Sequence, residues 1–128
     1  MKSIGTLNLE IYRCISKNIT TTEVIITDKQ IEHIKERHPN DYEQFSSFLT
    51  EIVASPDYII ESDRPHTAIL MKEVYSQNKY FKVIVRLATI FDPITHKNSI
   101  ITFLKIREKE WKRLLKNKQI LYKKSSLC

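Results

Sequence analysis

Apolar residues follow a helical spacing in the first part of the chain and an alternating spacing in the second part. Between residues 27 and 38, Ile31 and Ile34 recur at helical spacing. Pro39 ends this predicted helix, because the residue before a proline avoids helical backbone angles. A second apolar stripe predicts another helix from about residue 41 to residue 54.

Alternating apolar and polar residues then predict four strands joined by short turns, over residues 57–61, 67–75, 79–88 and 99–106. In the third strand, Phe81, Val83, Val85 and Leu87 share one side and are expected to face the core. A lysine-rich helix is predicted over residues 108–118. The sequence thus predicts an α+β fold in which N-terminal helices pack on a four-stranded antiparallel β-sheet, with a basic C-terminal helix.

Composition excludes several classes of protein. The single glycine, Gly5, leaves no glycine-rich loop that could bind a nucleotide phosphate. No run approaches the roughly 18 apolar residues of a membrane span, and the first residues lack an apolar signal segment, so a cytoplasmic protein is expected. Cys14 and Cys128 have no metal-binding spacing and are expected to be reduced thiols.

Positive charge is concentrated near the C-terminus. Residues 105–124 hold nine basic and two acidic side chains, a net charge of +7, whereas the whole chain carries +6. A basic block beside a nearly neutral body is typical of a protein with a polyanionic partner, and a solvated lysine-rich helix without a partner is the alternative.

Two histidines lie on the first predicted helix. His33 shares a helix face with Arg37, four residues later, so the two could meet an anionic substrate together. His38 lies about 140° further around the axis, toward the sheet, near the helix C-terminus. A surface histidine and a capping or core histidine are the structural alternatives. This spacing does not match the pair that clamps zinc, so no metal site and no cofactor are expected.

Arg86 interrupts an otherwise apolar strand, where a charge is costly unless it is paired or faces a groove. It could pair with a carboxylate such as Glu61 or Glu73, or it could bind a phosphate, which suits the planar guanidinium. Ser99 and Thr102 lie three residues apart on the fourth strand. Strict alternation puts them on opposite faces, unless a β-bulge intervenes.

Metal-independent RNA cleavage needs only side chains of these kinds. A base removes the proton of the 2′-hydroxyl, an acid protonates the leaving 5′-oxygen, and cations stabilise the phosphorane between them. No GxSxG motif or Ser–His–Asp order supports acyl transfer instead.

A combination of motifs resembles the phage-associated barnase–EndoU–colicin–RelE-like (BECR) nuclease domains. It comprises ITDKQIEHIKERHPNDYEQF, SPDYIIE, TAILMKEV, KYFKVIVRLA and the NSIIT strand with its basic continuation. The resemblance covers residues 25–124 and implies a metal-independent endoribonuclease that cleaves by 2′-hydroxyl transesterification, in a toxin or a mobile element. Residues 25–128 are therefore assigned to a ribonuclease domain. Residues 1–24 are assigned to an N-terminal extension, which could be an extra strand, a partner-binding arm or the remnant of a fusion.

The resemblance also implies a set of site residues. The expected catalytic residues are His33, His38, Arg86, Ser99 and Thr102, with either histidine as base or acid. The expected substrate-binding residues are Arg37, from the same motif, and four side chains of the basic C-terminal segment, chosen for their charge: Lys105, Arg107, Lys112 and Arg113.

The expected partners are RNA, with transfer RNA as one candidate, and an acidic immunity or antitoxin protein whose charge would match the basic tail. No membrane partner is expected. Two alternatives stay open at this point: a non-catalytic RNA- or protein-binding module of the same fold, and a structural protein of a phage particle.

Overall fold

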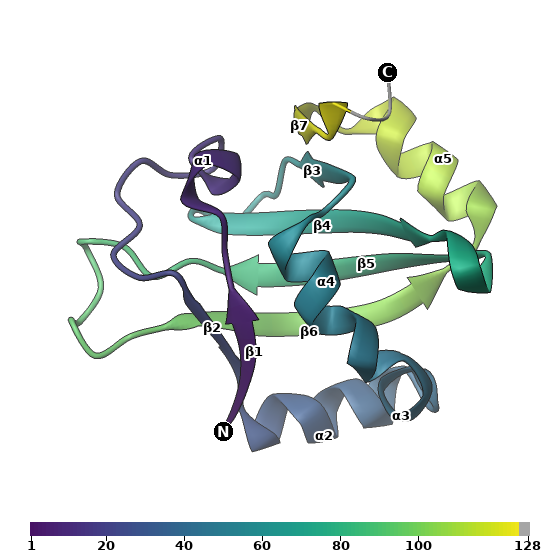
Figure 1. Cartoon of the computed structure of the whole chain (residues 1–128), viewed down its shortest axis with the longest axis horizontal. Helices are drawn as coiled ribbons and strands as arrows, with labels where there is room; N and C mark the ends of the chain where they lie inside the picture. The colour runs from purple at the N-terminus through teal and green to yellow at the C-terminus, as the bar shows by residue number, and fades with distance from the viewer. Residues whose placement is uncertain (126–128) are drawn as a thin grey trace.

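A mixed sheet of seven strands forms the centre of the computed structural model, which describes residues 1–125, so that Cys128 lies outside the described part (Figure 1). The strand order is β1-β2-β6-β5-β4-β3-β7. The strands are β1 (Lys2–Thr6), β2 (Glu23–Ile26), β3 (Tyr58–Ile60), β4 (Thr67–Val74), β5 (Lys79–Arg86), β6 (Asn98–Ile106) and β7 (Ile120–Lys123). The fold is α+β as expected, but the prediction of a four-stranded antiparallel sheet is wrong.

The four predicted strands β3 to β6 are present and pair antiparallel along the chain order. Three further strands extend this meander. β7 adds to β3 at one edge, and β2 joins β6 in a parallel pair that β1 then extends at the other edge. β2 and β7 have four residues each, and the sequence pattern does not show which strands they pair with, because these pairings connect residues far apart in the sequence.

The N-terminal residues are part of the sheet. β1 pairs with β2 and lies against α4, where the Thr50 hydroxyl donates to the Ile4 carbonyl at 2.6 Å. After β1 comes the short helix α1 (Leu9–Tyr12), whose buried Tyr12 donates a hydrogen bond to the Val53 carbonyl at 2.6 Å. Among the interpretations open for residues 1–24, the structure supports an additional strand.

The predicted helices are present, and one of them is broken. α2 (Asp28–Arg37) begins with the Thr27 side chain accepting a hydrogen bond from the Gln30 N–H. The second predicted helix is divided into α3 (Asp41–Phe45), the 3₁₀ turn η1 (Ser46–Phe48) and α4 (Leu49–Ala54). A second 3₁₀ turn, η2 (Tyr75–Gln77), connects β4 to β5, and the basic helix is α5 (Glu108–Asn117).

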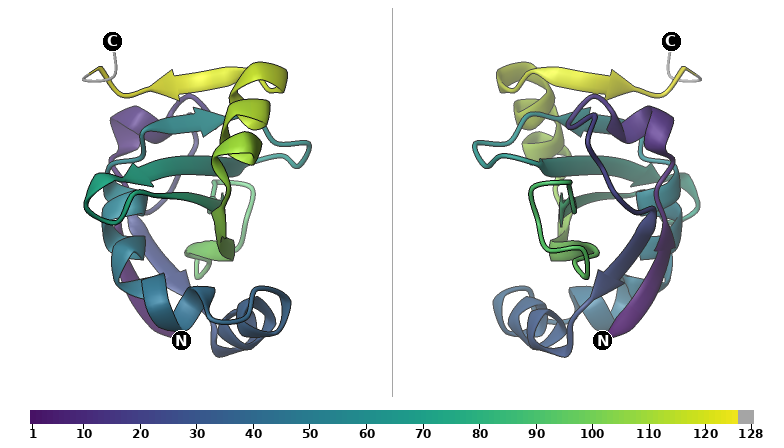
Figure 2. Two further views of the ribbon diagram at one scale, coloured as in Figure 1. Left: turned by 90° about the vertical axis from the view of Figure 1, so that its right-hand side faces the viewer. Right: turned by 90° about the vertical axis from the view of Figure 1, so that its left-hand side faces the viewer.

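The two faces of the sheet carry two separate cores. Phe81, Val83, Val85 and Leu87 are fully buried on the face covered by α4, as the alternation predicted. On the opposite face, Met71 packs with Trp111 of α5. Figure 2 shows that α5 lies over only the upper part of this second face, while α2 lies along its lower edge. Two hollows lie in the sheet surface between these helices. No helix within residues 1–125 is long and apolar enough to cross a membrane.

Candidate active site

The open part of the sheet is lined by three hollows that share residues and therefore form one groove. A hollow of about 610 Å³ lies over β4, β5 and the 61–65 loop, and one of about 680 Å³ lies against α2. The two share Arg64 and Ile101. A smaller hollow of about 220 Å³ continues from Arg86 to the loop before β6. Hollows of several hundred Å³ are large enough for a ligand of nucleotide size rather than a single ion.

A β-bulge in β6 decides which side chains reach the groove. Thr102 is opposite Ile84 and Ile100 is opposite Val85, so Ile101 is an extra residue in the ladder. The extra residue reverses the alternation between Ile100 and Thr102. Strict alternation would have separated Ser99 from Thr102. With the bulge, both line the groove while Ile100 stays fully buried on the other face.

Arg86 lies directly opposite Ser99 on the neighbouring strand. Its Nη2 is 2.9 Å from the Asp92 Oδ1, and its Nη1 donates to the Leu87 carbonyl. The suggested ion pairs of Arg86 with Glu61 or Glu73 are therefore wrong. The Glu61 side chain accepts a hydrogen bond from the Gln119 N–H, and the Glu73 N–H donates to the Asp57 carboxylate. The Arg86 side chain is 37% exposed, so part of the guanidinium remains open to the groove.

Asp92 is fixed from two directions. Its Oδ2 accepts from the Thr89 N–H at 2.8 Å and from the Thr89 hydroxyl at 3.2 Å. The Thr89 N–H, together with the Arg86 guanidinium, holds the pKa of Asp92 below its usual value. The carboxylate therefore stays charged and keeps Arg86 in one orientation.

α2 brings His33, Arg37 and His38 to the same hollow. The two histidines were expected on different sides of the helix. His38 lies at the C-cap with φ −130° and ψ 72°, so it has left the helical path, while its N–H still donates to the Ile34 carbonyl at 2.8 Å. The His38 side chain lines the same wall as the His33 side chain. Thr102 completes this wall from β6.

The groove contains residues that the sequence did not single out. Arg64 lines both large hollows, and His96 and Lys97 line the small one with Arg86. Lys118, which follows α5, lines the first hollow. Loop residues such as Arg64 and His96 have no periodicity, so only their proximity in the fold identifies them. The lining also includes exposed acids on α2, Glu32 and Glu36, so its charge is mixed rather than uniformly positive.

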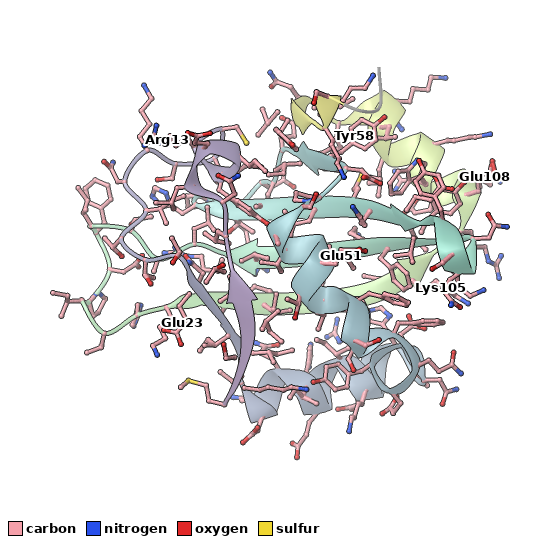
Figure 3. The ribbon with its side chains drawn as sticks, viewed as in Figure 1. Arg13, Glu23, Glu51, Tyr58, Lys105 and Glu108 are labelled. Atoms are coloured by element: carbon pink, nitrogen blue, oxygen red, sulfur yellow. The ribbon has the colours of Figure 1, made fainter. Side chains whose placement is uncertain are left out.

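Four of the expected substrate-binding residues lie away from the groove. Lys105 and Arg107 line a hollow beside the β5 start, and Arg107 and Arg113 line another along α5. Figure 3 shows Lys105 and Glu108 at the end of the sheet opposite the loop that follows Arg86. Lys112 pairs with Glu108 at 3.1 Å, and Arg113 pairs with Glu110. The basic helix α5 therefore forms a second surface outside the groove. Glu108 and Glu110 neutralise part of its positive charge.

Within residues 1–125, no three His, Cys, Asp or Glu side chains gather as a metal-binding group would. Groups that can move protons and groups that can bind anions do gather: three histidines and Thr102, with Arg37, Arg64 and Arg86 beside them. The fold and this groove define an α+β protein whose sheet face is suited to acid–base chemistry on an anionic substrate.

The comparison with protein families agrees with this class. The family described as phage-Barnase-EndoU-ColicinE5/D-RelE like nuclease2 matches residues 2–123, nearly the whole chain, and the protein belongs to this nuclease family. The match includes β1 and the residues assigned to an N-terminal extension. Searches among curated proteins and among solved structures give no match.

Proposed function

We propose that this nuclease is a metal-independent endoribonuclease that cleaves RNA by transesterification at the groove. The observation that carries the proposal is the convergence of His33, His38 and Thr102 on one wall with Arg86 and Ser99 along the same strand pair. These side chains supply proton transfer and anion binding, which are the two requirements of this reaction.

In the proposed reaction, one of His33 and His38 takes the proton of the 2′-hydroxyl, and the 2′-oxygen forms a bond to phosphorus. The bond from phosphorus to the 5′-oxygen breaks, and the other histidine gives a proton to that oxygen. The products are a 2′,3′-cyclic phosphate and a free 5′-hydroxyl. RNA supplies the nucleophile itself, so no activated side chain is required.

Arg86 is the proposed phosphate-binding residue. A guanidinium has five N–H donors, and Asp92 and the Leu87 carbonyl occupy one on each terminal nitrogen. The remaining donors can bind non-bridging phosphate oxygens as negative charge develops in the transition state. Ser99 and Thr102 would donate further hydrogen bonds to the same phosphate.

The test is incubation of the purified protein with total RNA in EDTA, beside Arg86→Ala and Arg86→Lys variants. Arg13→Ala is the matched control, because Arg13 is exposed after α1 (Figure 3) and lines none of the three hollows of the groove. We expect fragments that end in 2′,3′-cyclic phosphate from the wild type and Arg13→Ala, and a loss of about 100-fold or more in Arg86→Ala. Circular dichroism confirms that each variant is folded.

Intact RNA after incubation with the wild type, over several RNA classes, would contradict the proposal. Cleavage by both Arg86 variants at the wild-type rate would retain the ribonuclease and reject Arg86 as its phosphate-binding residue.

A further inference from the structure

The loop between β5 and β6 exposes an unusual amount of apolar surface. Among residues 1–125, six large apolar side chains are exposed, and three of them lie in this loop: Ile90, Phe91 and Ile94, at 63%, 73% and 99%. Phe91 differs from its neighbours because its ring is stacked on the His66 ring, with centroids 6.1 Å apart and an interplanar angle of 27°. One face of Phe91 is thus supported while most of the side chain meets solvent.

Local hydrogen bonds hold Phe91 in this exposed position. The Phe91 N–H donates to the Thr89 hydroxyl at 3.3 Å, and the next N–H, of Asp92, donates to the Thr89 carbonyl at 3.0 Å. On the other side, the Leu87 N–H donates to the His66 carbonyl at 2.8 Å and joins the two loops. The aromatic pair is therefore preorganised, so a ligand does not have to order it on binding.

His66 has features that are typical of functional positions. It has a positive φ of 53°, which costs free energy for a residue other than glycine. Its Nδ1 is the only buried side-chain nitrogen or oxygen without a hydrogen-bond partner in the described part of the chain. Packing alone does not explain a strained histidine beneath an exposed phenylalanine.

The aromatic pair is adjacent to Arg86 on both sides. Thr67, the residue after His66, pairs with Arg86 across β4 and β5. Asp92, the residue after Phe91, forms the ion pair with Arg86. Each member of the pair is therefore next in sequence to a residue that pairs with Arg86, so the aromatic pair and the proposed phosphate site are neighbours.

We propose that Phe91, supported by His66, is a stacking platform for a base of single-stranded RNA whose phosphate lies at Arg86. This inference rests on the proposed function, which assigns the groove to RNA. A flat aromatic face beside cationic groups is the surface that unpaired bases use, since every base has a face that can stack. A base held there would be splayed out of a helix, so the enzyme would select unpaired regions.

The platform is tested by fluorescence anisotropy with a short 2′-O-methyl oligoribonucleotide, which cannot be cleaved because its nucleophile is blocked. A second probe of equal length has abasic 2′-O-methyl residues and so presents the backbone without bases. We expect Phe91→Ala to bind the first probe about 5- to 150-fold more weakly. Its affinity for the abasic probe should change less than twofold. Phe91→Tyr should restore binding, and Ile94→Ala, the matched control from the same loop, should bind as the wild type does.

A second measurement uses Phe91→Trp as a reporter. A base stacked on the new indole quenches its fluorescence, while Trp111 of α5 is only 8% exposed and supplies a constant background. Quenching by the normal probe and none by the abasic probe is the expected result. Unchanged affinity in Phe91→Ala, equal weakening for both probes, or no RNA binding by the wild type would overturn the platform.

These results separate the platform from the nuclease. Cleavage that does not depend on Phe91 rejects the platform alone. Base-dependent binding through Phe91 without any cleavage rejects the proposed ribonuclease and retains the platform.

Discussion

Asp92 binds Arg86 through one carboxylate oxygen, at 2.9 Å, while its other oxygen accepts the Thr89 N–H at 2.8 Å. A single side chain thus connects the end of β5 to the loop that follows it. The guanidinium cannot turn away from the groove without breaking a charge-assisted hydrogen bond. We therefore infer that Asp92 positions Arg86 in the proposed reaction.

Asp92→Asn should lower kcat for RNA cleavage by about 10- to 100-fold, with KM changed little, because a displaced guanidinium loses mainly the interactions of the transition state. The substitution keeps the shape and removes the charge. In the Arg86→Ala background the same substitution should have almost no further effect, and a double-mutant cycle measures this. Additive losses in kcat would show that Asp92 acts independently of Arg86.

The lowered pKa of Asp92 gives a pH dependence with a definite sign. A carboxylate whose pKa is lower in the folded state stabilises the fold above its unfolded pKa of about 3.9, and this stability is lost as pH falls through the folded value. The free energy of unfolding of the wild type should exceed that of Asp92→Asn most clearly above about pH 5, and the difference should shrink in more acidic buffer. Urea unfolding at several pH values measures it, and a difference that grows toward acid would contradict the sign.

Thr102→Val should reduce cleavage by about 10- to 100-fold without loss of stability. The two side chains have nearly the same shape, so the change removes the hydroxyl from the groove and little else. Thr22→Val, at an exposed position before β2, is the control and should keep full activity. Wild-type rates in Thr102→Val would mean that the bulge brings Thr102 to the groove without a role in the reaction.

Asn98→Ala should destabilise the fold by about 2–4 kcal/mol, because Asn98 is fully buried and its loss leaves buried backbone groups without partners. Its side-chain NH₂ donates to the Thr21 and Glu23 carbonyls at 2.7 and 3.0 Å, and its oxygen accepts the Ala88 N–H at 2.8 Å. Thr95→Ala, at an exposed position in the loop before β6, should change stability by less than about 0.5 kcal/mol. Equal urea midpoints for both variants would refute this role of Asn98.

The basic helix should contribute to RNA affinity through charge alone. Arg107→Ala should weaken binding of all RNA sequences alike and reduce the slope of log affinity against log salt by about 1. Arg113→Ala should have a smaller effect, since Glu110 already neutralises Arg113. Titrations at several salt concentrations compare the two variants. Equal slopes in both variants and the wild type would exclude this surface from RNA binding.

The sequence named candidate site residues, whereas their arrangement depends on the tertiary structure. Histidine, arginine, serine and threonine in strand and helix contexts identified His33, His38, Arg86, Ser99 and Thr102 as candidates. Their common location depends on two backbone irregularities, the bulge at Ile101 and the departure of His38 from the helix. The bulge leaves no signal in the composition, whereas the departure of His38 follows from Pro39, because the residue before a proline avoids helical backbone angles.

By itself the sequence determined the α+β class, the helix α2 with its cap, the buried side of β5 and the nuclease family, because local periodicity and motif spacing encode these features. Tertiary structure decided the seven-stranded sheet, the Arg86–Asp92 pair and the proximity of His66 to Phe91. The parallel pairing of β2 with β6 and the stacking of two loops connect segments that are distant in the chain. Such contacts depend on how whole elements pack, which no local pattern of residues records.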